Sequence, residues 1–220
     1  KDRIPYTYFV MVIGTLALTG FPLTAGYFSK DAIIESAYAS HNPFAYYGFM
    51  MTVIAAGLTS FYSWRLIFKT FHGEPHDQAH YKAAHESPIW MLIPIGILAA
   101  GSILAGFPFK ELFTGHGVEE FFRDSLKMHP HIIEEMHHIP ETVAFLPTAM
   151  MILGFLVAWL FYIGRPHIPV RLAREHQMLY QFLLNKWYFD ELYDLIFVRS
   201  AKWLGRFLWK KGDGYVIDGF

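Results

Sequence analysis

Residues 6–40 read YTYFVMVIGTLALTGFPLTAGYFSKDAIIESAYAS. An apolar run stops at Gly20 and Pro22, and a second helical run begins near Ser29. At about 1.5 Å per residue each run covers roughly half a bilayer, so the two can span it only in series. Proline cannot continue a helical hydrogen-bond ladder, and glycine lowers the cost of unwinding. The stretch therefore predicts a membrane helix that is interrupted near its middle.

Lys30 follows this interruption directly. A charged side chain inside a bilayer is costly, so it is a candidate functional group. Backbone groups freed by the break need partners from protein or from a water-filled cavity. Asp31 and Glu35 stand at spacings at which a carboxylate can pair with the ammonium. The sequence predicts Lys30 as a proton-transferring residue, with Asp31 and Glu35 as candidate acceptors.

Two other interpretations of this stretch remain open. In the first, Ser29, Lys30 and Asp31 form an ordinary helix cap and the lysine extends to the headgroup region. The apolar flanks on both sides argue against it. In the second, two short helices belong to a soluble core, which the composition of the whole chain disfavours.

Composition indicates an integral membrane protein. The chain has 220 residues, of which 54% are hydrophobic and 18% aromatic, with a mean hydropathy of +0.26. The apolar residues come in long runs, as in membrane helices. A formal net charge of −1 gives no indication of nucleic-acid binding. The absence of cysteine excludes disulfides, thiolate metal sites and iron–sulfur ligation within the chain. Since the chain opens without methionine and ends abruptly, we expect a fragment of a longer protein.

The hydrophobic runs predict an all-α membrane protein with about four transmembrane crossings. The membrane part is residues 1–164, with the broken helix at 6–40 and further spans at 45–71, 88–107 and 142–164. Small residues at 55–60 predict close helix packing. Residues 165–220 interleave apolar and charged side chains, which predicts an amphipathic segment on the membrane surface.

The polar segments carry cations and histidines. Arg65 and Lys69 are either interfacial cations or pathway residues near an aqueous entrance. The histidines of the loop at 72–87 include His76 and His80, which one helical face would bring together at a spacing suited to zinc. A third ligand is not evident, so we predict a solvated loop and no metal site. The His-rich segment at 108–141 matches no motif.

Basic residues set the expected orientation. They gather at the start of the chain, around the 72–87 loop and in the C-terminal segment: Lys1, Arg3, Arg65, Lys69, Lys82, Arg165, Arg171 and Arg174. The positive-inside rule places that side, with the C-terminal segment, in the cytoplasm, or in the matrix for a mitochondrial protein.

Three blocks carry a resemblance to a known family. They are IGTLALTGFPLTAGYFSKDAIIE at 13–35, FYSWRLIFKTFHG at 61–73 and NKWYFDELYD at 185–194. With them the chain resembles the distal antiporter-like subunits of proton-pumping NADH:quinone oxidoreductase, respiratory complex I, called subunit L in bacteria and subunit 5 in mitochondria.

The resemblance implies the C-terminal part of such a subunit, from its twelfth to its fifteenth transmembrane helix and into its long lateral helix. Lys30 falls on the family's lysine in a discontinuous helix, near the proton outlet. The glutamate–lysine pair and central lysine of the family's first half have no counterpart here. The implied location is the bacterial cytoplasmic or mitochondrial inner membrane. Implied partners are the lipid bilayer and the other membrane subunits of complex I, including adjacent antiporter-like subunits.

The expected function is that of a proton-translocating subunit of an NADH:quinone oxidoreductase with no redox site of its own. FMN, iron–sulfur clusters and quinone are expected in partner subunits, and this chain carries no Gly-rich nucleotide fingerprint after a strand. One alternative is the large subunit of a multisubunit sodium/proton antiporter, which shares the 13–35 block. Another is a structural clamp in which Lys30 is inert. A His-based metalloenzyme would require a bound metal.

Overall fold

The computed structural model describes residues 1–75, 77–115, 117–125, 135–136, 138–217 and 219. Within these residues the chain is helical and contains no strand, so the predicted all-α class is confirmed. The chain divides into two compact units, Lys1–Pro166 and His167–Phe220.

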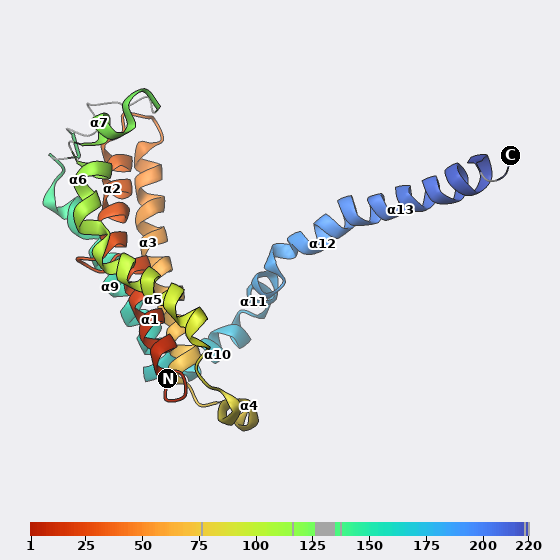
Figure 1. Cartoon of the computed structure of the whole chain (residues 1–220), viewed down its shortest axis with the longest axis horizontal. Coiled ribbons are helices and arrows are strands. Elements are labelled where there is room, and N and C mark those ends of the chain that lie inside the picture. Colours follow the sequence, from red (N-terminus) through yellow and green to blue (C-terminus); the bar gives the residue numbers. More distant parts are fainter. Residues whose placement is uncertain (76, 116, 126–134, 137, 218, 220) are drawn as a thin grey trace. The chain divides into compact units, whose positions relative to one another are not determined.

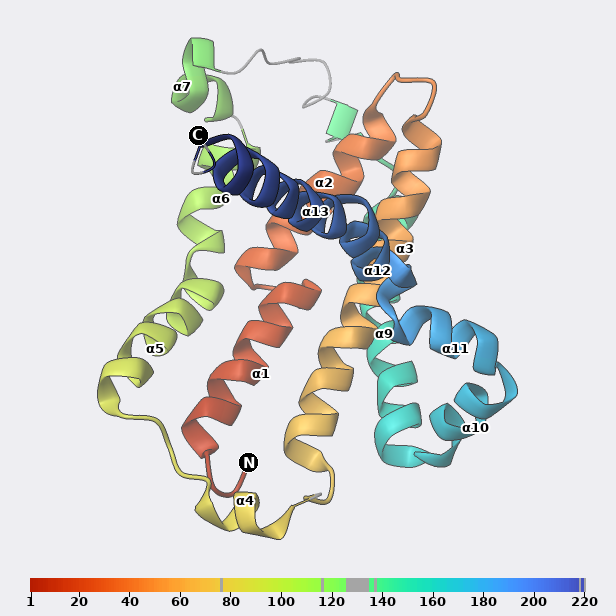
Figure 2. The same ribbon diagram turned by 90° about the vertical axis from the view of Figure 1, so that its right-hand side faces the viewer.

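The first unit is a bundle of long helices. Its helices are α1 (Pro5–Thr19), α2 (Ala25–Ala39), α3 (Ala45–Ile67), α4 (Gln78–Ala83), α5 (Ile89–Leu104), α6 (Gly106–Thr114), α7 (Val118–Phe122) and α9 (Glu141–Trp159). Wider π-helical turns prolong α3 through Phe68–His72 and α9 through Leu160–Gly164. Helix α2 continues the course of α1, and α3 returns beside both (Figure 1). Helix α5 lies against α1 on the side away from α3 (Figure 2).

Among the residues that the structure describes, two helical segments are long and apolar enough to cross a membrane on their own. They are Ala45–His72, with 28 residues, and Glu141–Gly164, with 24 residues. A third crossing results if α5 and the following Gly106–Phe113 count as one span bent by 59°. The sequence predicted about four crossings. The difference is the broken helix, because α1 has only 15 residues and α2 carries Lys30, Asp31 and Glu35.

Close contact between α3 and α9 forms the centre of the bundle. A Cβ atom at Gly154 would collide with the carbonyl oxygen of Gly57. The buried Ser60 hydroxyl donates a hydrogen bond to the Met151 carbonyl at 2.6 Å. Small residues allow such backbone approach between membrane helices, which confirms the close packing predicted for residues 55–60.

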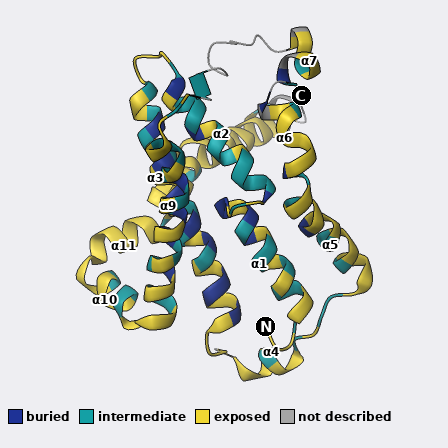
Figure 3. Ribbon diagram, turned by 90° about the vertical axis from the view of Figure 1, so that its left-hand side faces the viewer, coloured by how far each residue is buried: buried dark blue, intermediate teal, exposed yellow. Residues whose placement is uncertain are grey.

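Buried side chains gather at both ends of α3. One cluster joins Ile34 of α2 to Phe49, Val53 and Ala56, and the other joins Ile67, Phe68 and Phe71 to Ala158. Buried residues are frequent along α3, whereas α5 is largely exposed (Figure 3). Helix α3 therefore acts as the core helix against which α1, α2 and α9 are held.

The second unit is a series of shorter helices. They are α10 (His167–Glu175), α11 (Gln177–Leu184), α12 (Phe189–Tyr193) and α13 (Arg199–Phe207), with π-helical turns at Asp194–Val198 and Leu208–Ile217. The amphipathic segment expected over residues 165–220 is not one continuous helix. Lys186, Trp187 and Tyr188 have φ values of 53°, 61° and 57°, which form a left-handed turn between α11 and α12. Left-handed backbone angles are energetically unfavourable for residues other than glycine. The sequence therefore gives no sign of a turn at this position.

Candidate functional site

The break between α1 and α2 begins at Gly20. This residue has φ of +81°, and its N–H donates to the Ala17 carbonyl at 3.2 Å. The N–H of Phe21 donates to the Leu16 carbonyl at 2.9 Å. A left-handed residue closing the last helical turn is a common way for a helix to end, and glycine adopts it without a steric cost. The predicted interruption at Gly20 is therefore present, and its local cause is the glycine cap.

The chain then steps sideways into α2. The N–H and hydroxyl of Thr24 both donate to the Phe21 carbonyl, at 3.1 and 2.7 Å. A Cβ atom at Gly26 would collide with the carbonyl oxygen of Ala17. The first turn of α2 therefore lies directly against the last turn of α1, and only glycine leaves room for that contact.

Lys30 reaches back across this break. Its Nζ donates to the carbonyl oxygens of Leu18 at 3.2 Å and Thr19 at 3.5 Å. The last carbonyls of a helix have no partner within it and carry the negative end of the helix dipole. The half-buried ammonium thus completes the unpaired end of α1. The carbonyl oxygens carry only partial negative charges. A neutral Lys30 amine still has N–H groups that can donate to them, so the contact weakens but is not lost when the amine is uncharged.

The two acidic candidates form a row on α2 beside Lys30. Asp31 and Glu35 are one helical turn apart, and the Tyr27 side chain hydrogen-bonds Asp31. Residues spaced by four lie on one face of a helix, so Tyr27, Asp31 and Glu35 form a continuous strip. All three are half-buried. Tyr27 was not among the predicted site residues, although its spacing of four from Asp31 was a usable signal.

Arg65 and Lys69 lie elsewhere. Both are exposed near the end of α3 and its π-helical turn. The Arg65 guanidinium stands 5.7 Å from the centre of the Tyr162 ring, which belongs to the turn that prolongs α9. Within the described residues, no hydrogen bond or ion pair joins Arg65 or Lys69 to Lys30. The structure therefore brings together Lys30, Asp31 and Glu35 but not these two cations.

Two cavities flank the break. One of about 350 Å³ lies among α1, α3 and α5, and Leu18 is part of its wall. The other, of about 360 Å³, lies between α2 and α6, and Ser29 is part of its wall. Leu18 supplies a carbonyl to Lys30, and Ser29 precedes Lys30 in the chain. The lysine is therefore adjacent to residues that line a cavity on either side of the interruption.

The bend between α5 and α6 forms part of the wall of the second cavity. A Cβ atom at Gly106 would approach the Phe28 ring to 2.6 Å, so the start of α6 packs closely on α2. The Lys110 ammonium lies 5.5 Å from the centre of the same ring. Residues 88–107 were predicted as one span without this contact, because no residue pattern marks which glycine meets another helix.

The opposite end of α1 is fixed by Glu86. Its carboxylate accepts hydrogen bonds from the Tyr6 and Thr7 N–H groups at 2.6 and 3.1 Å and from the Thr7 hydroxyl at 2.8 Å. Desolvation raises the pKa of the Glu86 carboxyl, but these hydrogen bonds outweigh it, so its pKa lies below the ordinary value. A carboxylate at a helix N-terminus also interacts favourably with the dipole. Glu86 thus caps α1 from a distant loop, which sequence spacing could not reveal.

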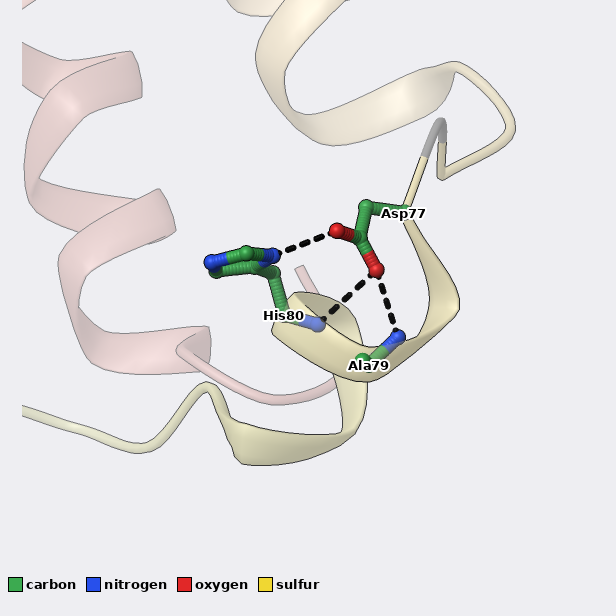
Figure 4. A network of polar contacts seen from close by, with 3 residues as sticks. All are labelled: Asp77, Ala79 and His80. Carbon is green, nitrogen blue, oxygen red and sulfur yellow. Dashed lines mark hydrogen bonds and ion pairs between the residues drawn. The ribbon is translucent and has the colours of Figure 1, made fainter.

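His80 of the 72–87 loop takes part in a local helix cap. Asp77 caps α4 by accepting from the N–H groups of Ala79 and His80 at 2.8 and 3.3 Å, and its second oxygen is 2.6 Å from the His80 ring (Figure 4). These hydrogen bonds, led by that of the His80 ring, hold the pKa of Asp77 below its usual range. His76 lies outside the described residues. Among the residues described, no three histidine or acidic side chains are grouped to hold a metal ion.

Comparison with known proteins gives concordant matches. The family described as "NADH:quinone oxidoreductase/Mrp antiporter, TM" matches residues 1–59. "NADH-quinone oxidoreductase subunit L" of Rhodobacter capsulatus is 42% identical, over 100% of this chain and 40% of its own length. The protein of the same name from Neisseria meningitidis serogroup B is 32% identical over 99% of the chain and 36% of its own length. "NADH-ubiquinone oxidoreductase chain 5" of Schizophyllum commune is 34% identical over 98% of the chain and 32% of its own length. The chain thus spans 40% or less of these relatives.

Proposed function

We propose that the chain is part of an antiporter-like subunit of the L and 5 family of NADH:quinone oxidoreductase and that it moves protons across the membrane by way of Lys30. The observation that carries this proposal is the contact between the Lys30 amine and the carbonyls of Leu18 and Thr19 at the break. A lysine ammonium has three N–H donors, and two of them are engaged here. The third can be transferred.

The balance between ammonium and amine at this position is adjustable. Desolvation disfavours the charged form and the neighbouring Asp31 favours it. The carbonyls of Leu18 and Thr19 accept hydrogen bonds from the amine. A change of about 1.36 kcal/mol in either contribution alters the ratio of the two forms tenfold. A charge that appears or disappears in an adjacent membrane subunit is therefore sufficient to add a proton to Lys30 or to remove one.

Asp31 and Glu35 are the proposed acceptors. They continue from Lys30 along α2 toward Ala39, where the helix ends. Water in the cavities beside the break would connect these groups, because a regular helix packed in lipid excludes water and an interrupted one need not. Arg65 and Lys69 are proposed only for the aqueous approach, since they lie near the other end of the bundle.

The remaining assignments follow from the family. The chain would act within the bacterial cytoplasmic or mitochondrial inner membrane, beside other membrane subunits of complex I. FMN, iron–sulfur clusters and quinone would reside in partner subunits, which carry the electrons. Residues 1–164 would form the membrane part. Residues 165–220 would lie along the cytoplasmic or matrix surface and lead into a lateral helix.

Two alternatives have an observation in their favour. The matching family also includes subunits of Mrp antiporters, which favours a sodium/proton antiporter. Purifying the native assembly and assaying NADH oxidation separates the two. The second unit exposes large apolar side chains such as Trp203 and Phe207, which suits a structural clamp. In that case deleting residues from 180 onward disrupts assembly, while Lys30 substitutions have no effect.

Substituting Lys30 tests the proposal. In the complete complex, Lys30→Ala should abolish most proton translocation while the complex still assembles. Lys82→Ala, in the exposed helix α4, is the matched control and should translocate normally. Proton uptake into vesicles, measured per NADH oxidised, is the readout. Normal translocation by Lys30→Ala would refute the assignment.

A further inference from the structure

Two buried serines on α3 differ in how their hydroxyls are satisfied. Ser60 is fully buried and donates to the Met151 carbonyl of α9. Ser63 is only 5% exposed, and its hydroxyl has no hydrogen-bond partner within the described part of the chain. A buried polar group without a partner is costly, and such groups commonly bind water or another ligand. The contact between α3 and α9 accounts for the buried hydroxyl of Ser60 but not for that of Ser63.

Ser63 lines the cavity among α1, α3 and α5. Thr15 of α1, only 6% exposed, lines the same cavity, and so do Tyr62 and Ser102. The volume of about 350 Å³ has room for several waters, each of which occupies about 30 Å³ in the liquid. The rest of the wall is aliphatic and carries no carboxylate. Water gathered at the hydroxyls therefore fits this cavity better than a cation does.

We propose that this cavity binds water through the hydroxyls of Ser63 and Thr15. Leu18 forms part of its wall, and the Leu18 carbonyl accepts a hydrogen bond from Lys30. Water bound there reaches the end of α1 at which the lysine is held, and joins the break to the half of the bundle that contains α1. The hydration stands on the cavity and its hydroxyls, whereas its role in proton transfer rests on the proposed function.

Cysteine accessibility tests the hydration. The chain has no cysteine, so Ser63→Cys places a single thiol in the cavity, and Ser60→Cys places one three residues away in the contact with α9. The thiolate is the reactive form, and it develops where water is present. The complete complex in native membranes is treated with a small water-soluble methanethiosulfonate, and modification is located by peptide mass analysis.

We expect Ser63→Cys to react at least about tenfold faster than Ser60→Cys, because only the first thiol meets bound water. Thr15→Cys should react like Ser63→Cys, and it replaces that variant if the latter does not assemble. Ala56→Cys, buried in the α2–α3 cluster, replaces Ser60→Cys in the same way. Cavity thiols that are as inert as the control thiols, or control thiols that react as fast, would overturn the proposal.

A second experiment measures the role of this water. Ser63→Ala and Thr15→Val remove the hydroxyls with little change in side-chain volume. Each should lower proton translocation several-fold, on the order of one lost hydrogen bond, with assembly intact. Unchanged proton translocation in both variants would show that this water has no role in proton transfer. If Lys30→Ala pumps normally while Ser63→Cys is labelled, the proposed function fails and the hydration stands. If Lys30→Ala stops pumping while Ser63→Cys is inert, only the hydration fails.

Discussion

The interruption between α1 and α2 and the bend between α5 and α6 both involve glycine, but they differ in backbone conformation and hydrogen bonding. At the first, Gly20 and Leu23 have φ of +81° and +71°, and the chain leaves the helical conformation. At the second, Ala105 keeps helical angles and its N–H still donates to the Gly101 carbonyl at 2.9 Å. Only the first frees carbonyls for a side chain, and only there does a lysine bind them.

This difference separates a break that creates a polar site from a bend that shapes packing. Carbonyls exposed by a true break must find a donor at membrane depth. A bend that keeps its hydrogen bonds creates no such need. We therefore expect substitutions at the two places to have separable effects on proton transfer and on stability.

The largest effect on stability is expected at Gly26. A methyl group there collides with the Ala17 backbone, which cannot rotate away as a side chain can. Gly26→Ala should destabilise the protein by about 3 kcal/mol. Gly14→Ala is the control, because nothing lies within 4 Å of that position and alanine favours helix. Thermal unfolding of the assembled complex measures both, and equal midpoints would show that the half-helices are not in contact.

A smaller effect is expected at Gly106. A methyl group there meets the Phe28 ring at 2.6 Å and the Ala25 backbone at 3.0 Å, and the ring can move partly aside. Gly106→Ala should cost about 1–2 kcal/mol and should retain proton translocation, since the Lys30 contacts do not involve α6. Gly101→Ala has open space around it and is the control. Loss of translocation with unchanged stability would contradict the distinction between break and bend.

The smallest effect is expected at Glu86, which holds the far end of α1. Glu86→Gln removes the charge from the cap and should lower the thermal midpoint at neutral pH. Because the folded pKa of Glu86 lies below its ordinary value, the carboxylate contributes stability above about pH 4.3. That contribution is lost as pH falls through the lower folded value. The difference between wild type and Glu86→Gln should therefore vanish in acid, whereas Glu74→Gln should match wild type throughout.

The sequence was informative where single residues dictate the backbone. Gly20 and Pro22 predicted an interruption, which is present between α1 and α2, and the apolar runs predicted the helical class, which is confirmed. The role of Lys30 remains a prediction. The hydrogen-bond acceptors of its amine are the main-chain carbonyls of Leu18 and Thr19, and no residue pattern in the sequence indicates that contact.

Other features depend on contacts between distant parts of the chain. Glu86 meets Tyr6 and Thr7 only in the folded bundle, and the fit of Gly106 on Phe28 depends on how α6 packs on α2. The left-handed turn at Lys186–Tyr188 is built from residues that disfavour it, so propensity pointed to a continuous helix. Ser63 differs from Ser60 only in what faces it.

The central claim is that the Lys30 amine loses and regains its proton at the break. Lys30→Arg tests it most directly, because a guanidinium keeps the positive charge and the hydrogen-bond donors but does not release its proton. Proton translocation per NADH oxidised is compared in the assembled wild-type and Lys30→Arg complexes. We predict that Lys30→Arg assembles and translocates few protons. Translocation at the wild-type level would contradict the claim, because a fixed charge would then be sufficient.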